Sequence, residues 1–173
     1  MEILIVYSSY SGNTEKVAYR MKKAFEKNNH HTDIYKIDEN TDPEDPPFNY
    51  KDYDFLCVGS PVKMGLPSQE LVNMMMLHRR GVKRKIVPGP KKGAVFATYG
   101  GAHLGPKEAE TALAMLESCI EHLKFKCVGR FSCPGKMVDY ATPEWYHGDI
   151  RNRPNATDLD NAEKFILEIL KSV

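Results

Sequence analysis

The sequence has no long apolar run and no excess of charge of one sign. Its 173 residues contain no stretch near the ~18 apolar residues that a membrane span requires. The apolar start at residues 1–7 is short and lacks the basic residues that begin a signal peptide. Basic and acidic residues number 24 and 23, so the overall charge indicates no nucleic-acid partner. We therefore expect a cytoplasmic protein with no membrane insertion and no nucleic acid among its partners.

Metal-binding cysteine motifs are also missing. Four cysteines are present (Cys57, Cys119, Cys127 and Cys133), and none of them forms a C-x-x-C pair. That spacing is typical of zinc ribbons, iron–sulfur clusters and thioredoxin-type sites, which the sequence therefore disfavours. We predict buried thiols in a reducing compartment and no metal site.

The composition is that of an ordinary globular domain, with 42% hydrophobic and 27% charged residues. The length fits a single domain spanning residues 1–173. Apolar runs predict strands at residues 2–7, 31–37, 55–59, 93–98 and 125–131. Helical periodicity predicts helices after residue 12, from Ser68, over residues 107–123, and a last helix that Thr157 opens as its cap together with Asp160. Residues 38–54, rich in acids and prolines, predict an exposed loop.

Five strands alternating with four helices predict an α/β fold. The expected architecture is a doubly wound five-stranded parallel sheet in the order 2-1-3-4-5, with helices on both faces. In such sheets a ligand binds beyond the carboxyl ends of the strands, next to the point where the strand order reverses. The turns after the first, third and fourth strands should meet there.

The first of these turns, residues 8–14, leads directly into a helix. It carries three hydroxyl side chains, Gly12 and an Asn13-Thr14 pair that we expect to cap the helix, whose unpaired amides suit a phosphate dianion. An ordinary Ser/Asn-capped helix remains an alternative for this turn alone. The Walker and dinucleotide glycine patterns are absent, so a nucleotide ligand would be a mononucleotide.

The second and third turns, residues 59–67 and 98–105, are rich in glycine. Their backbones can approach a ligand closely, and Tyr99 offers an aromatic face to a flat ring. Either turn alone is a simple glycine-rich loop, but three such turns converging on one crevice indicate a binding site.

Residues 9–14, read S-Y-S-G-N-T, resemble the phosphate-loop pattern (S/T)-x-(S/T)-G-N-(S/T) of the flavodoxin-like FMN-binding proteins. The other two turns resemble that family's second and third loops, as found in flavodoxin-like flavoproteins and quinone reductases. The resemblance covers essentially the whole chain and implies non-covalently bound FMN, with its phosphate on the first turn and its isoalloxazine between the other two. The cofactor-binding residues that it implies are Ser9, Tyr10, Ser11, Gly12, Asn13, Thr14, Pro61, Val62, Lys63, Met64, Gly65, Thr98, Tyr99, Gly100, Gly101 and His103.

The sequence differs in two features from the acidic short-chain flavodoxins of this family. The chain is nearly neutral, and its only tryptophan, Trp145, lies outside the second turn. Lys63 in that turn is expected to stabilise negative charge on the reduced ring and to raise its potential. The long connection over residues 134–156 is expected to cover the flavin edge or to pack against the outer edge of the sheet.

These observations predict an FMN-dependent redox protein that transfers electrons between a reduced donor and an acceptor. One alternative is an NAD(P)H-dependent reductase of quinone-like acceptors, and another is a flavin-free regulatory module on the same fold. The expected partners are a redox protein, or NAD(P)H with a quinone-like acceptor, and a homodimer is compatible with the sequence. The basic run at residues 78–92 is expected to be a solvated surface or a docking site for an acidic partner or a cofactor phosphate. No catalytic side chain is assigned, although Tyr99 and His103 are candidates for substrate contact.

Overall fold

Five parallel strands form one sheet in the order β2-β1-β3-β4-β5, which confirms the predicted topology. The structure is a computed structural model, and it describes residues 1–79, 89–100, 104–136 and 150–172. The strands are β1 (Glu2–Tyr7), β2 (His31–Lys36), β3 (Phe55–Val62), β4 (Lys91–Tyr99) and β5 (Phe125–Pro134). The order reverses beside β1, which has β2 on one side and β3 on the other.

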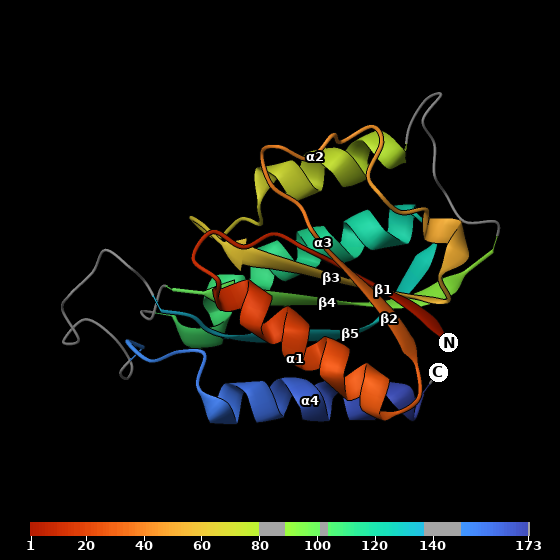
Figure 1. Ribbon diagram of the computed structural model, residues 1–173. Helices are drawn as coiled ribbons and strands as arrows, with labels where there is room; N and C mark the ends of the chain where they lie inside the picture. Colours follow the sequence, from red (N-terminus) through yellow and green to blue (C-terminus); the bar gives the residue numbers. More distant parts are fainter. Residues whose placement is uncertain (80–88, 101–103, 137–149, 173) are drawn as a thin grey trace.

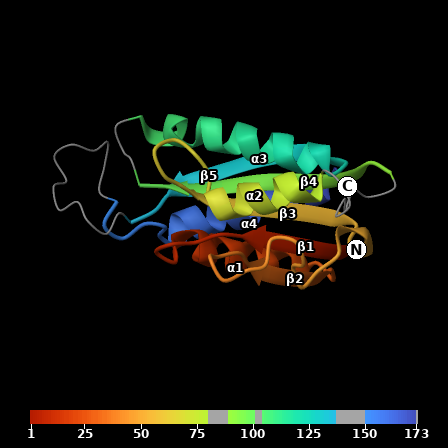
Figure 2. The ribbon, with the colours of Figure 1, turned by 90° about the horizontal axis from the view of Figure 1, so that it is seen from above.

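Four α-helices cover the two faces of this sheet (Figure 1). They are α1 (Asn13–Lys27), α2 (Gln69–His78), α3 (Glu110–His122) and α4 (Ala156–Leu170). Helices α2 and α3 lie on one face, and α1 and α4 on the other; Figure 2, seen from above, places α2 and α3 over the sheet. Alternate residues of each strand therefore enter two separate cores, as Leu4 and Val6 do on the α2–α3 side and Ile3 and Ile5 on the α1–α4 side.

Several predicted boundaries are wrong by a few residues. Strand β3 continues past residue 59 to Val62, because Ser60–Val62 pair with Ala97–Tyr99 of β4. Helix α4 is capped by Asn155 and not by Thr157. The Asn155 side chain accepts from the Asp158 amide at 3.1 Å, and Asp158 accepts from the Asn155 amide at 2.8 Å, a complete capping box. The helix predicted over residues 107–123 is a 3₁₀ turn, Gly105–Ala109, followed by α3.

The loop predicted to be exposed over residues 38–54 is exposed only in its acidic part. Phe48, Tyr50 and Tyr53 are buried, and Tyr50 packs edge-on against His78 at the end of α2. The Tyr50 hydroxyl lies 3.1 Å from His78 Nδ1, and His78 Nε2 donates to the Pro43 carbonyl at 2.9 Å. Charge composition predicted exposure for the whole segment, but its aromatic residues extend the α2–α3 core.

All four cysteines are free, and three of them are buried, which agrees with the predicted thiols; Cys127 is half-buried. Among the residues that the structure describes, none of the helices is long and apolar enough to cross a membrane. In the same part of the chain, no group of three or more His, Cys, Asp and Glu side chains is placed to hold a metal ion.

Candidate functional site

A cavity of about 550 Å³ opens at the carboxyl ends of β1, β3, β4 and β5. Its volume is within the range of pockets that hold small molecules and cofactors, about 300–1,000 Å³. Eleven of the sixteen residues predicted for the cofactor site line it: Tyr10, Ser11, Asn13, Pro61, Val62, Lys63, Met64, Gly65, Thr98, Tyr99 and Gly100. The three turns therefore meet at one place, as the topology predicted.

The remaining predicted residues do not line this cavity or cannot be placed. Ser9 is buried, and its Oγ accepts from the Glu15 amide at 3.3 Å. Thr14 is also buried, with its hydroxyl 2.8 Å from that of Thr98, so it joins α1 to β4. Gly12 lies between two lining residues, while Gly101 and His103 lie outside the described residues.

Helix α1 points its amino end at this cavity and has a glycine as its N-cap. Gly12, with φ 81°, has no side chain to accept a hydrogen bond, and in the first turn the Glu15 amide donates to Ser9 Oγ. The expected cap by Asn13 and Thr14 is wrong, because both residues are already helical. A residue with a side chain is strained at this φ, so glycine is favoured. The first amides of a helix have no partner within it and carry partial positive charge, so this end of α1 is suited to an anion.

The turn after β3 is a tight hairpin that carries two cavity-lining residues at its tip. Lys63 and Leu66 exchange backbone hydrogen bonds of 2.9 and 3.0 Å, and both central residues have positive φ, 53° at Met64 and 77° at Gly65. This is the geometry of a type I′ turn, which favours glycine or asparagine. Met64 therefore sits in a strained conformation, and it is 94% exposed. The turn presents Lys63 and Met64 at the cavity without burying either.

Tyr10 joins the first turn to the start of α2. Its hydroxyl donates to Glu70 Oε2 at 3.2 Å, and the same oxygen accepts from Ser68 Oγ at 2.6 Å. These hydrogen bonds, that from Ser68 first, lower the pKa of the Glu70 carboxyl, with the nearby charge of Lys63 acting in the same direction. Ser68 in turn donates its amide to Ser60 Oγ at 2.7 Å. The loops after β1 and β3 are thus held together by side chains.

Tyr99 lines the cavity but is only 6% exposed. The prediction that it offers a full ring face to a ligand therefore differs from the structure, in which most of the ring is covered by protein. Burial raises the pKa of the Tyr99 hydroxyl above its ordinary value. The ring belongs to the core on the α2–α3 side, where the alternation of β4 places it.

Three lining residues were not predicted: Glu108, Gly135 and Lys136. Gly135 and Lys136 directly follow β5, which ends at the same edge of the sheet as the other strands. The rule that parallel strands present their carboxyl ends together could have found them. Among the described lining residues, Lys63 and Lys136 against Glu108 give the lysine and carboxyl side chains a net positive charge.

The connection over residues 134–156 and the basic run over residues 78–92 lie largely outside the residues that the structure describes. Of residues 134–156, positions 137–149 with Trp145 are not among the described residues, and neither are positions 80–88 of the basic run. Lys91 and Lys92, which end that run, begin β4 and donate to the backbone carbonyls of Lys51 and Ser172. They lie at the amino edge of the sheet, opposite the cavity.

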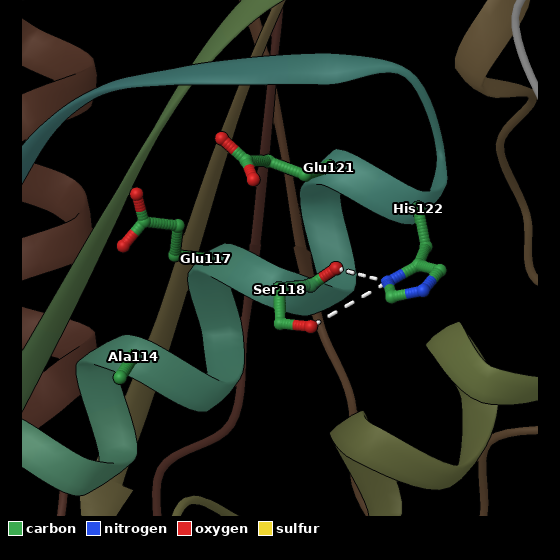
Figure 3. A pocket seen from close by; sticks show the side chains of 5 residues that line it. All are labelled: Ala114, Glu117, Ser118, Glu121 and His122. Carbon is green, nitrogen blue, oxygen red and sulfur yellow. Dashed lines mark hydrogen bonds between the residues drawn. The ribbon is translucent and has the colours of Figure 1, made fainter.

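A second hollow, of about 410 Å³, lies on the outer side of α3 (Figure 3). It is lined by Ala114, Glu117, Ser118, Glu121 and His122. Its polar groups bind nearby partners: Glu117 pairs with Arg130, Glu121 accepts from the Cys127 amide at 3.4 Å, and His122 Nδ1 donates to the Ser118 carbonyl at 2.6 Å. Arg130 and Cys127 belong to the edge strand β5, so these carboxylates cover an otherwise open sheet edge.

Comparison with known proteins identifies similar sequences and folds. The family model described as the flavodoxin domain matches residues 4–165. A flavodoxin-like domain-containing protein, BilS of Clostridioides difficile (strain CD3), is 27% identical over 140 residues, covering 80% of this chain and 69% of its own. Flavodoxin 1 from Bacillus cereus superposes with a TM-score of 0.71 at 16% identity, over 100% of this chain and 99% of that one. A flavoprotein from Lactobacillus acidophilus NCFM, solved in complex with FMN, matches 76% of this chain and 92% of its own with a TM-score of 0.52 and 19% identity.

Proposed function

The chain belongs to the flavodoxin domain family, and from this premise we propose that it is an FMN-dependent redox protein that transfers electrons between a reduced donor and an acceptor. The observation that carries the proposal is the cavity at the carboxyl edge of the sheet, bounded by the amino end of α1, where the N-cap is a glycine, and by the loops after β3 and β4. The family match and the FMN complex of the structural neighbour both support FMN as the cofactor.

The residues of the cavity fit this group. The phosphate would lie on the amides at the start of α1, where the N-cap is Gly12, and on Ser11. The ring would lie between Val62–Gly65 and Thr98–Gly100. Bound FMN supplies the redox chemistry, while the chain binds it, orients it and sets the charge around it. In the described part of the cavity wall, Lys63, Lys136 and Glu108 are the lysine and carboxyl side chains that can do so.

We predict that Lys63→Ala lowers the midpoint potential of the FMN-loaded protein. Lys63 is exposed on the turn that lines the cavity, and removing its charge makes added negative charge on the ring less favourable. If the affinity for reduced FMN falls tenfold relative to that for oxidised FMN, the midpoint potential of a two-electron couple falls by about 30 mV. The measurement is an anaerobic titration against reference dyes, with Lys107→Ala as a control exposed lysine outside the cavity wall. A midpoint unchanged by Lys63→Ala would remove Lys63 from this role.

The rim of the cavity supports a protein as the redox partner. Among the described residues, the four most exposed large apolar side chains are Tyr10, Met64, Leu66 and Leu104, between 51% and 94% exposed. Tyr10 and Met64 line the cavity, and Leu66 and Leu104 lie farther along the loops after β3 and β4. Exposed apolar residues gathered at one place are typical of a surface that binds another molecule. This observation favours an electron carrier over a reductase that binds NAD(P)H and a quinone-like acceptor.

The cytoplasm remains the proposed location, and the four free cysteines support it because disulfides are rare in reducing compartments.

The function is tested by adding FMN to purified apoprotein and following flavin fluorescence. We expect saturable binding at one FMN per chain. The loaded protein is then mixed with NADH or NADPH and a quinone, and a carrier should show little steady-state oxidation of either nucleotide. Rapid turnover would favour the reductase, and no binding of FMN would favour a flavin-free module and overturn the proposal.

A further inference from the structure

The side chain of Asn13, in the first turn of α1, uses both protons of its amide nitrogen within the protein. Nδ2 lies 3.0 Å from Ser11 Oγ and 2.8 Å from the carbonyl oxygen of Lys136. An amide nitrogen has two protons to donate, so none is left for a ligand. Because Ser11 Oγ accepts one of them, the Ser11 hydroxyl proton is free to be donated to an anion at the start of α1.

The backbone of Lys136 is held on both sides. Its carbonyl accepts from Asn13, and its amide donates to the carbonyl of Arg153 at 2.7 Å. The preceding residue, Gly135, permits this approach, since a Cβ there would lie 2.7 Å from Asn13 Nδ2. The end of β5 and the start of α1 are thereby packed together at a distance that only glycine allows.

Arg153 is itself fixed by Asp158 in the first turn of α4. The guanidinium Nε and Nη2 each donate to one carboxylate oxygen of Asp158. Asp158 is buried and also accepts from the Asn155 amide at 2.8 Å. Such a two-point pairing sets the orientation of both side chains. The hydrogen bonds to Asp158 also raise the pKa of the Arg153 guanidinium.

We propose that Arg153 and Asp158 are positioning residues for the anion site at the start of α1. They hold the backbone of Lys136, whose carbonyl orients the Asn13 side chain. Asn13 then donates to Ser11 Oγ, so that the Ser11 hydroxyl proton is directed toward the anion. We call this chain of contacts, Asp158–Arg153–Lys136–Asn13–Ser11, the Asn13 relay. It gives α4, which does not line the cavity, an effect on phosphate recognition.

This inference rests on the proposed function, in which the anion is the phosphate of FMN. FMN and riboflavin share the ring and the ribityl chain and differ in the phosphate. A residue that acts through the anion site changes the affinity for FMN and leaves that for riboflavin nearly unchanged. A residue that only stabilises the fold changes both affinities together, or neither.

The test measures the dissociation constants of FMN and riboflavin for apoprotein by fluorescence quenching. For Asp158→Asn we expect the FMN constant to rise about tenfold, the order expected for losing one well-oriented hydrogen bond to a charged group, while the riboflavin constant changes less than about twofold. The matched control is Asp160→Asn, on the same helix, which breaks the exposed pair between Arg20 and Asp160 and should leave both constants unchanged. The combination of Asn13→Ala with Asp158→Asn should cost less than the sum of the two, because both act through the same relay.

Each outcome decides the inference. An unchanged ratio of the two constants in Asp158→Asn, or fully additive effects in the double variant, overturns it. Should Asp158→Asn fail to fold, Arg153→Lys keeps the charge, loses the two-point pairing and is measured in the same way. The proposed function fails separately, if the unmodified apoprotein binds no FMN or binds it no better than riboflavin.

Discussion

Apoprotein carrying Ser11→Asp is expected to lose FMN affinity about a hundredfold or more while becoming slightly more stable. The carboxylate would occupy the position of the hydroxyl of the exposed Ser11, directly before the N-cap Gly12 of α1. An acid near a helix N-terminus stabilises it by about 0.3–1 kcal/mol, but two negative charges about 4 Å apart repel by roughly 4 kcal/mol near a protein surface. The same substitution therefore moves stability and phosphate binding in opposite directions.

The measurements are the free energy of unfolding in urea and the dissociation constants of FMN and riboflavin. Ser11→Asn, which has nearly the same shape as Ser11→Asp without the charge, separates repulsion from the loss of the hydroxyl. We expect it to weaken FMN binding far less than Ser11→Asp. If Ser11→Asp bound FMN as tightly as the unmodified chain, the phosphate could not lie at the start of α1.

Gly59→Ala is expected to lower the free energy of unfolding by about 3 kcal/mol, at the upper end of the cost of overfilling a core. A Cβ at Gly59 would lie 2.0 Å from the ring of Phe96, which is completely buried between β4 and the helices α1 and α4. The ring cannot leave without opening a void, so strand β3 must shift. For a chain of this length the loss corresponds to roughly 6–12 °C in melting temperature.

Two further variants test this cause. In Gly59→Ala combined with Phe96→Leu, the smaller side chain makes room, and part of the lost stability should return despite the lost apolar contacts. Gly89→Ala is the control, because no atom lies within 4 Å of an added Cβ there. We expect Gly89→Ala to be neutral or stabilising. Equal losses in Gly59→Ala and Gly89→Ala would contradict the steric explanation.

Gly59 also illustrates where interpretation from sequence was incomplete. The sequence predicts Gly59 as the last residue of a strand and the first of a turn that approaches a ligand, but it lies inside β3, paired with Phe96 of β4. A glycine in a sequence indicates that another group packs closely against the backbone, but it does not identify that group. Whether a ligand or a neighbouring ring fills the space depends on which strand lies alongside.

Much of the site was predictable because topology alone brings loops together. The apolar runs identified the five strands, and the order of parallel strands placed the turns after β1, β3 and β4 at one edge. The hydroxyl-rich turn before α1 was identified by residue type. The way in which this turn begins the helix was not predicted, because Gly12 is the N-cap and the Asn13 side chain donates to the Lys136 carbonyl instead of capping the helix.

Local patterns in the sequence predict the α/β fold, the strand order and the three turns that form the cavity, because periodicity and residue type are local properties and the order of a parallel sheet leaves few arrangements. The folded structure was needed to show that Lys136 and Glu108 join the cavity wall, that Tyr99 packs in the core, and that Arg153, paired with Asp158 of α4, accepts a hydrogen bond from the Lys136 amide. These features depend on contacts between residues more than a hundred positions apart, such as Asn13 and Lys136, or on the register of one strand against the next. No local pattern carries that information, since the distance between such groups is set by the packing of the whole sheet.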